Sequence, residues 1–213
     1  MDSYRHKGLR KKLIDSIRSK GIRDENVLEA MNRVPRHQFM DSSFINFSYT
    51  DKAFPISAGQ TISQPYTVAF QTELLAVKKH VKVLEVGTGS GYQTAVLLEM
   101  GARVYTIERQ RTLFLEAQKT LAALNYKPVF FYGDGYEGLP AYAPFDRILI
   151  TAAALEVPRV LLDQLSVGGI LVLPEGGPSG QRMIQVIRES EDKFNRTEHG
   201  YFTFVPLLRG KTS

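Results

Sequence analysis

Three glycines at alternate positions, Gly87, Gly89 and Gly91, follow a run of β-branched residues and precede a stretch with helical periodicity. Glycine tolerates a positive φ and lets a ligand approach the backbone closely, because it has no Cβ. Glu108 comes 21 residues after Gly87, at the end of the next predicted strand. A carboxylate at that place can accept hydrogen bonds from both hydroxyls of a ribose. The pattern predicts a site for a nucleotide-containing cofactor, at the sheet edge where ligands of open α/β folds bind.

The spacing of the glycines distinguishes between two classes of cofactor. A dinucleotide site carries G-x-G-x-x-G, whereas this chain has Tyr92 where that pattern requires its last glycine. The G-x-G-x-G found instead, in V-L-E-V-G-T-G-S-G from Val83, resembles the first motif of class I methyltransferases. That resemblance implies S-adenosylmethionine as the cofactor, with no metal. The residues expected to hold the cofactor around this motif are Glu85, Gly87, Thr88, Gly89, Gly91, Glu108 and Arg109.

Asp134 stands between two glycines, directly after the predicted strand 129–132. Asp-Gly is also common in tight turns, so the tripeptide alone does not separate a turn from a binding site. Its position at the carboxyl end of a strand favours binding. If the chain is a methyltransferase, Asp134 meets the adenine amino group and Gly135 permits the close approach.

Strands and helices alternate through the middle of the chain, as in a mainly parallel sheet with helices on both faces. The predicted strands are 81–86, 103–108, 129–132, 147–150 and 169–173, and the predicted helices are 92–100, 111–124 and one from Pro158. Residues 183–188 and 201–205 read as further strands without a helix between them, which predicts an antiparallel hairpin at the sheet edge. The polar residues 189–200 are expected to connect them.

The first part of the chain has a different pattern. Residues 1–34 predict two helices, the second beginning near Asp24 and ending before Pro35. Residues 35–65 lack periodicity but contain several aromatic side chains, so we expect a long loop that packs against the domain. Pro65 suits the first turn of a helix running to about residue 79.

Length and pattern together predict one α/β domain with a doubly wound, mainly parallel sheet. A chain of 213 residues is long enough for a single well-packed core. The expected parts are an N-terminal helical and loop extension at 1–80, a cofactor-binding core at 81–175 and C-terminal strands at 176–213.

The net charge of +5 arises in the first 20 residues, which hold seven Lys/Arg against two acidic residues, while the remainder is formally neutral. A solvated helix face is the simplest explanation, and contact with nucleic acid or another acidic surface is the alternative. The absence of cysteine excludes disulfides and thiolate metal sites and fits a reducing compartment, so we expect a cytoplasmic protein. No apolar run approaches the roughly 20 residues of a membrane span, and no N-terminal segment is typical of a secretory signal.

Several separated segments resemble one family, the protein-L-isoaspartate (D-aspartate) O-methyltransferases. The most specific is Gly59-Gln-Thr-Ile-Ser-Gln-Pro65, which is similar to the family's signature ahead of the core. The others, in the family's order, are the glycine segment from Val83, Gly-Asp-Gly, Phe145-Asp-Arg-Ile-Leu-Ile-Thr-Ala-Ala-Ala154, Glu156-Val-Pro158 and Phe204-Val-Pro-Leu207. Leu155 departs from the family pattern, which often has proline there. The resemblance covers about residues 34–207 and implies a seven-stranded class I methyltransferase fold.

The resemblance implies transfer of the cofactor methyl group to the free α-carboxylate of an L-isoaspartyl or D-aspartyl residue in a damaged protein or peptide. The ester then collapses through a succinimide toward normal aspartate. By the same resemblance Ser63 hydrogen-bonds the acceptor carboxylate, backbone groups of Ile62 and Gln64 assist, and Val205 and Leu207 line the peptide channel. Without the resemblance, the Thr-Ile-Ser segment before a proline would read as a turn. The expected partners are isoaspartyl proteins, acted on by a monomer without nucleic acid or membrane.

The residue types are consistent with this chemistry. An α-carboxyl group has a pKa near 3.5, so it is already an anion at neutral pH and requires no general base. The chain's four histidines, His6, His37, His80 and His199, lie outside the motifs and are expected at the surface. What remains for the enzyme is alignment of the reacting atoms.

Four other functions fit less well or remain open. Base-amino methylation of nucleic acid usually relies on an Asn/Asp-Pro-Pro-aromatic tetrad after the fourth strand, where this chain has Thr151-Ala-Ala-Ala154. A small-molecule methyltransferase is not distinguished by the core alone. A binding module that has lost catalysis is disfavoured by the intact Gly87, Gly89 and Glu108, and a dehydrogenase by the glycine spacing.

Overall fold

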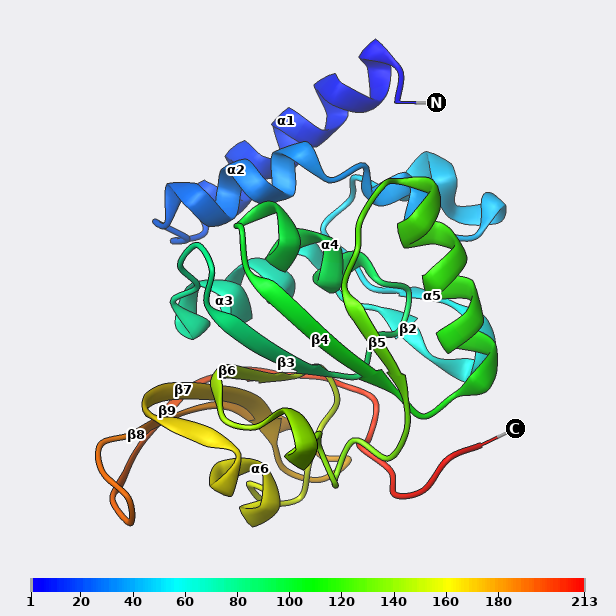
Figure 1. Cartoon of the computed structure of the whole chain (residues 1–213). Coiled ribbons are helices and arrows are strands. Elements are labelled where there is room, and N and C mark those ends of the chain that lie inside the picture. Colours follow the sequence, from blue (N-terminus) through cyan, green and yellow to red (C-terminus); the bar gives the residue numbers. More distant parts are fainter. Residues whose placement is uncertain (1, 213) are drawn as a thin grey trace.

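A seven-stranded sheet runs through the middle of the molecule, in the order β5-β4-β3-β6-β7-β8-β9 (Figure 1). The computed structural model describes residues 2–212. The strands are β3 (Lys82–Val86), β4 (Arg103–Glu108), β5 (Val129–Tyr132), β6 (Phe145–Ile150), β7 (Leu165–Glu175), β8 (Gln181–Arg188) and β9 (Phe194–Phe202). Strands β5, β4, β3, β6 and β7 are parallel, and β8 and β9 continue the sheet antiparallel. The predicted α/β class with an antiparallel edge is confirmed.

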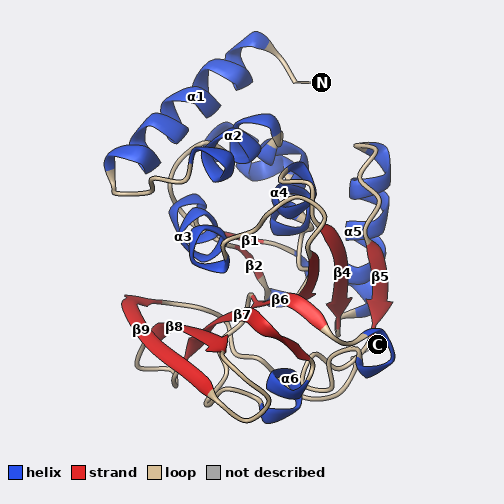
Figure 2. Cartoon of the chain, turned by 60° about the vertical axis from the view of Figure 1, so that its left-hand side comes forward, coloured by secondary structure: helices blue, strands red, loops and turns tan. Residues whose placement is uncertain are grey.

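Helices cover both faces of this sheet (Figures 1 and 2). The helices are α1 (Tyr4–Ser19), α2 (Glu25–Arg33), α3 (Pro65–Leu75), α4 (Tyr92–Glu99), α5 (Arg111–Ala123) and α6 (Arg159–Asp163). The first five lie on one side of the sheet and α6 lies on the other. Asp24 caps α2 as predicted, because its side chain accepts a hydrogen bond from the Asn26 N–H.

Alternation along the strands supplies the two faces of the core. In β3, Val83 packs with the side chains of α1–α4, whereas its neighbour Leu84 packs on the opposite face with Leu161 of α6. All three side chains are fully buried. Strands that are buried on both faces read as continuous apolar runs, and this explains why the sequence predicted the central strands well.

The strand order switches sides at β3. Strands β4 and β5 lie on one side of β3, and the later strands β6 and β7 lie on the other. The carboxyl ends of β3, β4 and β6 therefore open a crevice, the usual position for a ligand in such sheets. Residues 60–63 of the predicted loop at 35–65 line this crevice, and the loop is built from short pieces. These are η1 (Arg36–Phe39), η2 (Ser42–Phe47), β1 (Phe54–Pro55), η3 (Ser57–Gly59) and β2 (Thr61–Ile62), with β1 and β2 paired antiparallel.

Two predicted elements differ from the structure. Residues 194–200 were expected to be a polar connection, but they form most of β9, and the strand expected at 201–205 ends at Phe202. Strand β9 is a largely exposed edge strand, so it lacks the alternation by which strands are predicted from sequence. Helix α3 ends at Leu75 rather than near residue 79, because Ala76 takes a left-handed conformation with φ 48°. Within residues 2–212, no helix combines the length and apolar character needed to cross a membrane.

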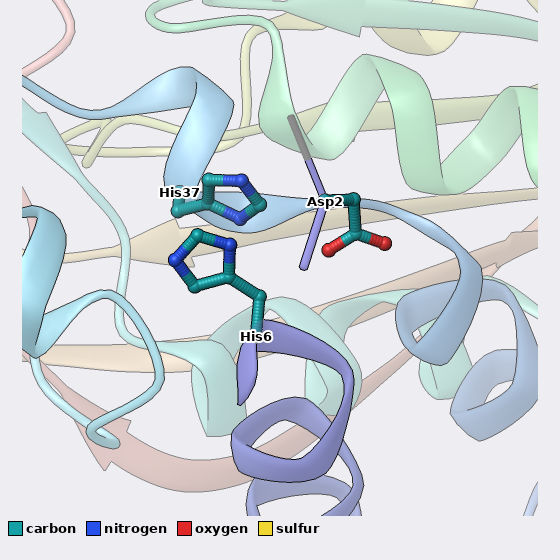
Figure 3. A group of neighbouring side chains, drawn as sticks. All are labelled: Asp2, His6 and His37. Carbon is teal, nitrogen blue, oxygen red and sulfur yellow. The ribbon is translucent and has the colours of Figure 1, made fainter. Parts of the chain in front are cut away.

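The N-terminus is attached to the body of the protein by a cluster of Asp2, His6 and His37 (Figure 3). The two imidazole rings lie 3.9 Å apart between centroids, and the potential ligand atoms of the three residues lie within 4.8 Å of one another. The cluster has the composition of a metal site, but both oxygens of Asp2 already accept hydrogen bonds from Arg10, at 3.1 and 2.9 Å. His37 Nδ1 lies 2.7 Å from the Tyr49 hydroxyl, and His6 Nδ1 accepts from the Ser3 N–H. Through these hydrogen bonds the cluster holds the N-terminal segment in place.

The expectation that all four histidines lie at the surface is wrong for His37, which is 5% exposed. Burial and the neighbouring His6 lower the pKa of His37 below its ordinary value of 6.5. The folded state therefore binds the proton less readily than the unfolded state, and stability is lost as the pH falls below about 6.5.

We expect the melting temperature to fall between pH 7 and pH 5.5, and the fall to be smaller in His37→Asn, whose amide cannot titrate. Thermal unfolding followed by circular dichroism across this range checks it. His80→Asn is the matched control, since His80 is exposed and has a positive φ that asparagine tolerates. An unchanged pH slope in His37→Asn would contradict the assignment.

Candidate active site

The crevice at the switch in strand order is a cleft of about 880 Å³, including its open mouth. It lies between the glycine loop, the segment from β2 to α3, and the C-terminal segment after β9. Most of the residues predicted from sequence line it, namely Ile62, Ser63, Gly87, Thr88, Gly89, Glu108, Arg109, Gly135, Val205 and Leu207. The structure thus brings the predicted donor and acceptor segments to one cleft, whose lining includes Ile62 and Leu207, 145 residues apart in sequence. Gln64, Glu85, Gly91 and Asp134 were also predicted but are not among the residues that line the cleft.

The glycine loop needs glycine for two different reasons. Gly87 has φ 95°, and a Cβ there would lie 2.5 Å from Thr151 Oγ1, which hydrogen-bonds the Gly87 carbonyl. Gly91 begins α4 with φ 87°, and a Cβ there would lie 2.8 Å from Leu121 of α5. Gly87 therefore permits the turn out of β3, while Gly91 permits close packing of α5 behind the loop.

Glu108 closes the loop from the neighbouring strand. Its Oε2 accepts a hydrogen bond from the Gly89 N–H at 2.9 Å, and its Oε1 accepts one from the Gln110 N–H at 2.8 Å. The side chain is 5% exposed yet lines the cleft. Because a carboxylate offers about four lone pairs, both oxygens can still accept hydrogen bonds from a ligand's hydroxyl groups.

Glu85 lies beneath the loop and is fully buried. Its Oε2 accepts hydrogen bonds from Thr94 Oγ1 at 2.5 Å and from Thr106 Oγ1 at 2.6 Å. Burial raises the pKa of Glu85 to about 7, the two threonine hydroxyls oppose that rise, and Glu108 adds to it. Glu85 was predicted to hold the cofactor, but its side chain is not exposed to the cleft. Its hydrogen bonds instead support the loop from below.

The Glu85 network also determines which way Thr88 presents its hydroxyl. When Glu85 is ionised, Thr106 donates its single hydroxyl proton to it, so in the 2.6 Å contact between Thr88 Oγ1 and Thr106 Oγ1 the donor is then Thr88. Thr88 lines the cleft and is left with lone pairs only. It can accept a hydrogen bond from a cationic or N–H group of a ligand, but it has no proton to give.

Asp134 and Arg109 are both engaged by the C-terminal tail. Asp134 Oδ2 accepts a hydrogen bond from the Gly210 N–H at 2.6 Å, and Oδ1 accepts from the Tyr136 N–H at 2.9 Å. Arg109 donates from Nε to the Gly210 carbonyl at 2.9 Å. Asp134 keeps two lone pairs for a ligand, whereas the Arg109 guanidinium is directed at the tail.

The acceptor side of the cleft is fixed by a residue that the sequence did not indicate. Asp51 accepts hydrogen bonds from the Tyr66 N–H at 2.8 Å and from Gln64 Nε2 at 3.1 Å, and forms an ion pair with Lys20 at 2.5 Å. Gln64 and Tyr66 flank the start of α3, immediately after Ser63. Asp51 therefore holds the backbone on which Ser63 is carried, and the Gln64 side chain points to Asp51 rather than to the cleft.

The segment Val205–Leu207 is held by pairing with the end of β6. The Ala153 N–H donates to the Val205 carbonyl at 2.8 Å, and the Leu207 N–H donates to the Ala153 carbonyl at 2.7 Å. The buried Gln181 accepts a hydrogen bond from the Phe204 N–H at 2.8 Å. These bonds place Val205 and Leu207 on the cleft wall, as the sequence predicted for a lining segment.

Several polar side chains that line the cleft were missed from sequence, and Gln71, Gln93 and Thr151 are three of them. Gln71 and Gln93 are buried in helices with apolar neighbours, and Gln93 Oε1 has no hydrogen-bond partner in the described part of the chain. A buried amide with an unsatisfied acceptor is rare in proteins. The sequence feature that could have indicated both positions is a glutamine among the apolar residues of a predicted helix.

Tyr92 also lines the cleft and is backed by a buried cation. The Arg36 guanidinium lies 4.8 Å from the centre of the Tyr92 ring and is fully buried. Burial lowers the pKa of Arg36 to about 10 and raises that of Tyr92 to about 12, so Tyr92 is neutral and Arg36 charged at pH 7. The ring is therefore held in place by its contact with the Arg36 guanidinium.

The cleft combines a carboxylate at one end, a serine at the other and apolar walls between them, formed by Ile62, Val68, Val86, Leu113, Val205 and Leu207. Such a site can hold a nucleoside by its ribose while an acceptor group approaches from the serine side. Among the side chains that line it, none forms the pair of base and orienting group that proton abstraction requires. The arrangement is suited to a transfer in which alignment, and not proton removal, limits the rate.

Comparison with known proteins identifies a family. Residues 8–212 match the family model described as protein-L-isoaspartate(D-aspartate) O-methyltransferase. A protein-L-isoaspartate O-methyltransferase from Christiangramia forsetii is 58% identical over 211 residues, which is 99% of this chain and 99% of the relative. One from Cytophaga hutchinsonii is 57% identical over 207 residues, covering 97% of this chain and 94% of the relative.

Solved structures show the same fold. A protein-L-isoaspartate O-methyltransferase structure superposes with a TM-score of 0.84 at 26% identity, covering 92% of this chain and 65% of the other, so this chain spans about two thirds of that protein. A Plasmodium falciparum protein described as such a methyltransferase, in complex with S-adenosyl-L-homocysteine, superposes with a TM-score of 0.82 at 24% identity, covering 93% of this chain and 98% of the other.

The raised pKa of Glu85 predicts a pH-dependent stability. A group whose pKa rises from 4.5 to about 7 on folding stabilises the protein below pH 4.5 and loses that contribution as the pH rises to about 7. In Glu85→Gln this loss is absent, so the stability of the variant relative to the parent should rise by on the order of 3 kcal/mol between pH 4.5 and pH 8.

Urea unfolding of both proteins at several pH values measures this difference. Comparison of the two slopes removes any constant penalty for the amide and any contribution from His37. A difference that does not change with pH would show that Glu85 is ionised in the folded protein.

Proposed function

The chain belongs to the protein-L-isoaspartate(D-aspartate) O-methyltransferase family, and we propose that its cleft brings the methyl group of S-adenosylmethionine to the free α-carboxylate of an isoaspartyl residue. The protein is a methyltransferase of damaged proteins and peptides, acting on L-isoaspartyl and D-aspartyl residues. The methyl ester initiates repair, because it collapses through a succinimide toward normal aspartate. The observation that carries the assignment of the site is the meeting of the glycine loop and the Ser63 segment in one cleft.

The residues of the cleft fit the cofactor. Glu108 has free lone pairs at the end of β4, where the two ribose hydroxyls would lie, and Asp134 has free lone pairs at the end of β5 for the adenine amino group. Gly135 lines the cleft, and glycine is required there for packing, since a Cβ would lie 2.4 Å from Val86. Thr88 offers an acceptor to the ammonium group. When bound, S-adenosylmethionine supplies an electrophilic methyl group on a sulfonium centre.

The chain's own task is to bring the acceptor carboxylate into line. The carboxylate is ionised at neutral pH and needs no base. Ser63 would donate a hydrogen bond to one carboxylate oxygen, with the backbone at Ile62 and Gln64 assisting, and leave the other oxygen to attack. The apolar walls from Ile62, Val205 and Leu207 exclude water, which would otherwise solvate the nucleophile. Asp51 acts on Ser63 as a positioning residue through the hydrogen bonds to Gln64 and Tyr66.

The finer assignments of partner and location are part of the proposal. Three of the basic side chains of the N-terminal segment have acidic partners within the fold, in the ion pairs Arg10–Asp2, Arg18–Glu25 and Lys20–Asp51. This favours a structural use of those charges over a nucleic-acid contact. We therefore propose a monomer that acts on isoaspartyl proteins in the cytoplasm, for which the lack of cysteine is a further argument. We also propose that the three predicted segments act together as one domain.

Peptides that differ only in the linkage of one residue test the substrate. Incubation of an isoaspartyl peptide and its aspartyl counterpart with S-adenosylmethionine should add 14 mass units to the isoaspartyl peptide alone (about one CH₂ group), since only it has a free α-carboxylate at that residue. Mass spectrometry reads the outcome. Equal methylation of both peptides, or of neither, would reject the substrate assignment.

Ser63→Ala should lower kcat by about 10- to 100-fold, the value of one hydrogen bond to a charged group, with little change in cofactor affinity. Glu108→Ala is the complementary variant, for which we expect the binding of S-adenosylhomocysteine to weaken far more than the thermal stability changes. Steady-state kinetics and isothermal titration calorimetry separate the two effects. If Ser63→Ala turns over at the parent rate, Ser63 does not act on the acceptor.

A further inference from the structure

The last described residues of the chain cross the carboxyl ends of β4 and β5 as an extended strap, residues 209–212 (Figures 1 and 2). The Thr212 N–H donates to the Arg109 carbonyl at 3.0 Å, and the Thr212 carbonyl accepts from the Arg111 N–H at 3.2 Å. The same carbonyl accepts from the Tyr132 hydroxyl at 2.7 Å. The strap is therefore hydrogen-bonded to both strands that carry the predicted nucleoside contacts.

Side chains at the strand ends complete these contacts. Arg109 donates to the carbonyls of Gly210 at 2.9 Å and Arg209 at 3.3 Å. Asp134 accepts from the Gly210 N–H at 2.6 Å. The Arg209 guanidinium lies 4.4 Å from the centre of the Tyr136 ring. The basic residue after β4 and the acidic residue after β5 are thus joined through a single glycine of the strap.

The strap continues directly from the cleft wall. Residues 205–208 line the cleft opposite the glycine loop, and the strap begins at the next residue. Pairing of Pro206 with Ala153 fixes the start of this segment, and pairing of Thr212 with Gln110 fixes its end. The chain therefore spans from the end of β6 to the end of β4, across the mouth of the crevice.

We infer that the strap is a positioning element of the cofactor site, which holds Asp134 and Arg109 in place for the adenosyl half of S-adenosylmethionine. This inference rests on the proposed contact between Asp134 and adenine. Neither oxygen of Asp134 has a side-chain partner within residues 2–212, so without the Gly210 N–H only the Tyr136 N–H fixes the orientation of the carboxylate. The strap thereby restricts the rotamer of Asp134, whose remaining lone pairs are the proposed acceptors for the adenine amino group.

The strap is also the part of the site best placed to open. Arg209, Gly210 and Lys211 are exposed, and the hydrogen bonds of the strap lie at the surface, where local opening is easiest. If the cofactor binds only when the strap is docked, its apparent affinity is reduced by the fraction of molecules in which the strap is open. By linkage, the bound cofactor should protect the strap amides from hydrogen exchange to the same extent.

Removal of residues 209–213 from the full chain tests the inference. We expect the Kd for S-adenosylhomocysteine to rise at least tenfold, while kcat at saturating S-adenosylmethionine and the KM for an isoaspartyl peptide stay within about twofold of the parent. A strap with a purely structural role would lower stability without this division between donor and acceptor. A Kd within twofold of the parent overturns the inference.

Tyr132→Phe keeps the chain intact and removes only the hydroxyl that donates to the Thr212 carbonyl. We expect a smaller rise in Kd, of about two- to fivefold, and this variant carries the test if the truncated chain does not fold. Tyr201→Phe on β9 is the matched control, since Tyr201 is 70% exposed and contacts Arg182 rather than the strap. Equal Kd values for Tyr132→Phe and Tyr201→Phe overturn the inference.

Asp134→Ala, the truncation and the combination of both separate two hypotheses, the adenine contact of Asp134 and the role of the strap. If Asp134→Ala alone binds S-adenosylhomocysteine like the parent, the proposed adenine contact is wrong, and the inference that rests on it falls with it. If Asp134→Ala weakens binding and the truncation does not, the adenine contact stands and the strap inference is overturned. If the strap acts through Asp134, truncation should weaken binding no further in the Asp134→Ala background, whereas additive losses would contradict that route.

Discussion

The hydrogen bond from the Gly89 N–H to Glu108 connects the glycine loop to the adjacent strand, and the donor side of the cleft depends on it. The loop leaves β3 with a positive φ at Gly87, and its N–H groups need acceptors where the strand pairing ends. Glu108 satisfies one of these amides and keeps lone pairs for a ligand. Glu85 supports the same loop from beneath through Thr106 and Thr88. Glu108 therefore binds the loop and can still accept hydrogen bonds from a ligand, whereas Glu85 only supports the loop.

The acceptor side depends on a different part of the chain. Lys20 at the end of α1 pairs with Asp51, and Asp51 accepts hydrogen bonds from the Gln64 side chain and the Tyr66 N–H at the start of α3. Ser63 immediately precedes that point. The N-terminal helices are consequently part of the site's support, although none of their side chains lines the cleft. The basic character of the N-terminus thus finds part of its use in fixing this segment.

Features that arise from neighbouring residues could be predicted from the sequence. The glycine spacing, the acid at the end of β4 and the Asp24 cap are local patterns, and the central strands are continuous apolar runs. Contacts between distant segments could not be predicted, because no local pattern encodes them. Asp134 with Gly210, Asp51 with Tyr66 and the buried pair of Arg36 and Tyr92 are examples. Glu85 belongs to the glycine motif that the sequence predicted, but the sequence did not indicate that its side chain is buried beneath the loop.

Strand β9 has a consequence for how the molecule meets its substrates. An edge strand exposes unpaired backbone groups that can pair with any extended chain and begin aggregation. Here the edge carries Arg196 and Glu198, which form ion pairs with Glu175 and Arg182 and keep charges along its length. Charged side chains on an edge oppose such pairing. This protein approaches damaged and partly unfolded chains, which could add a strand to an exposed sheet edge. The charges on β9 oppose that pairing.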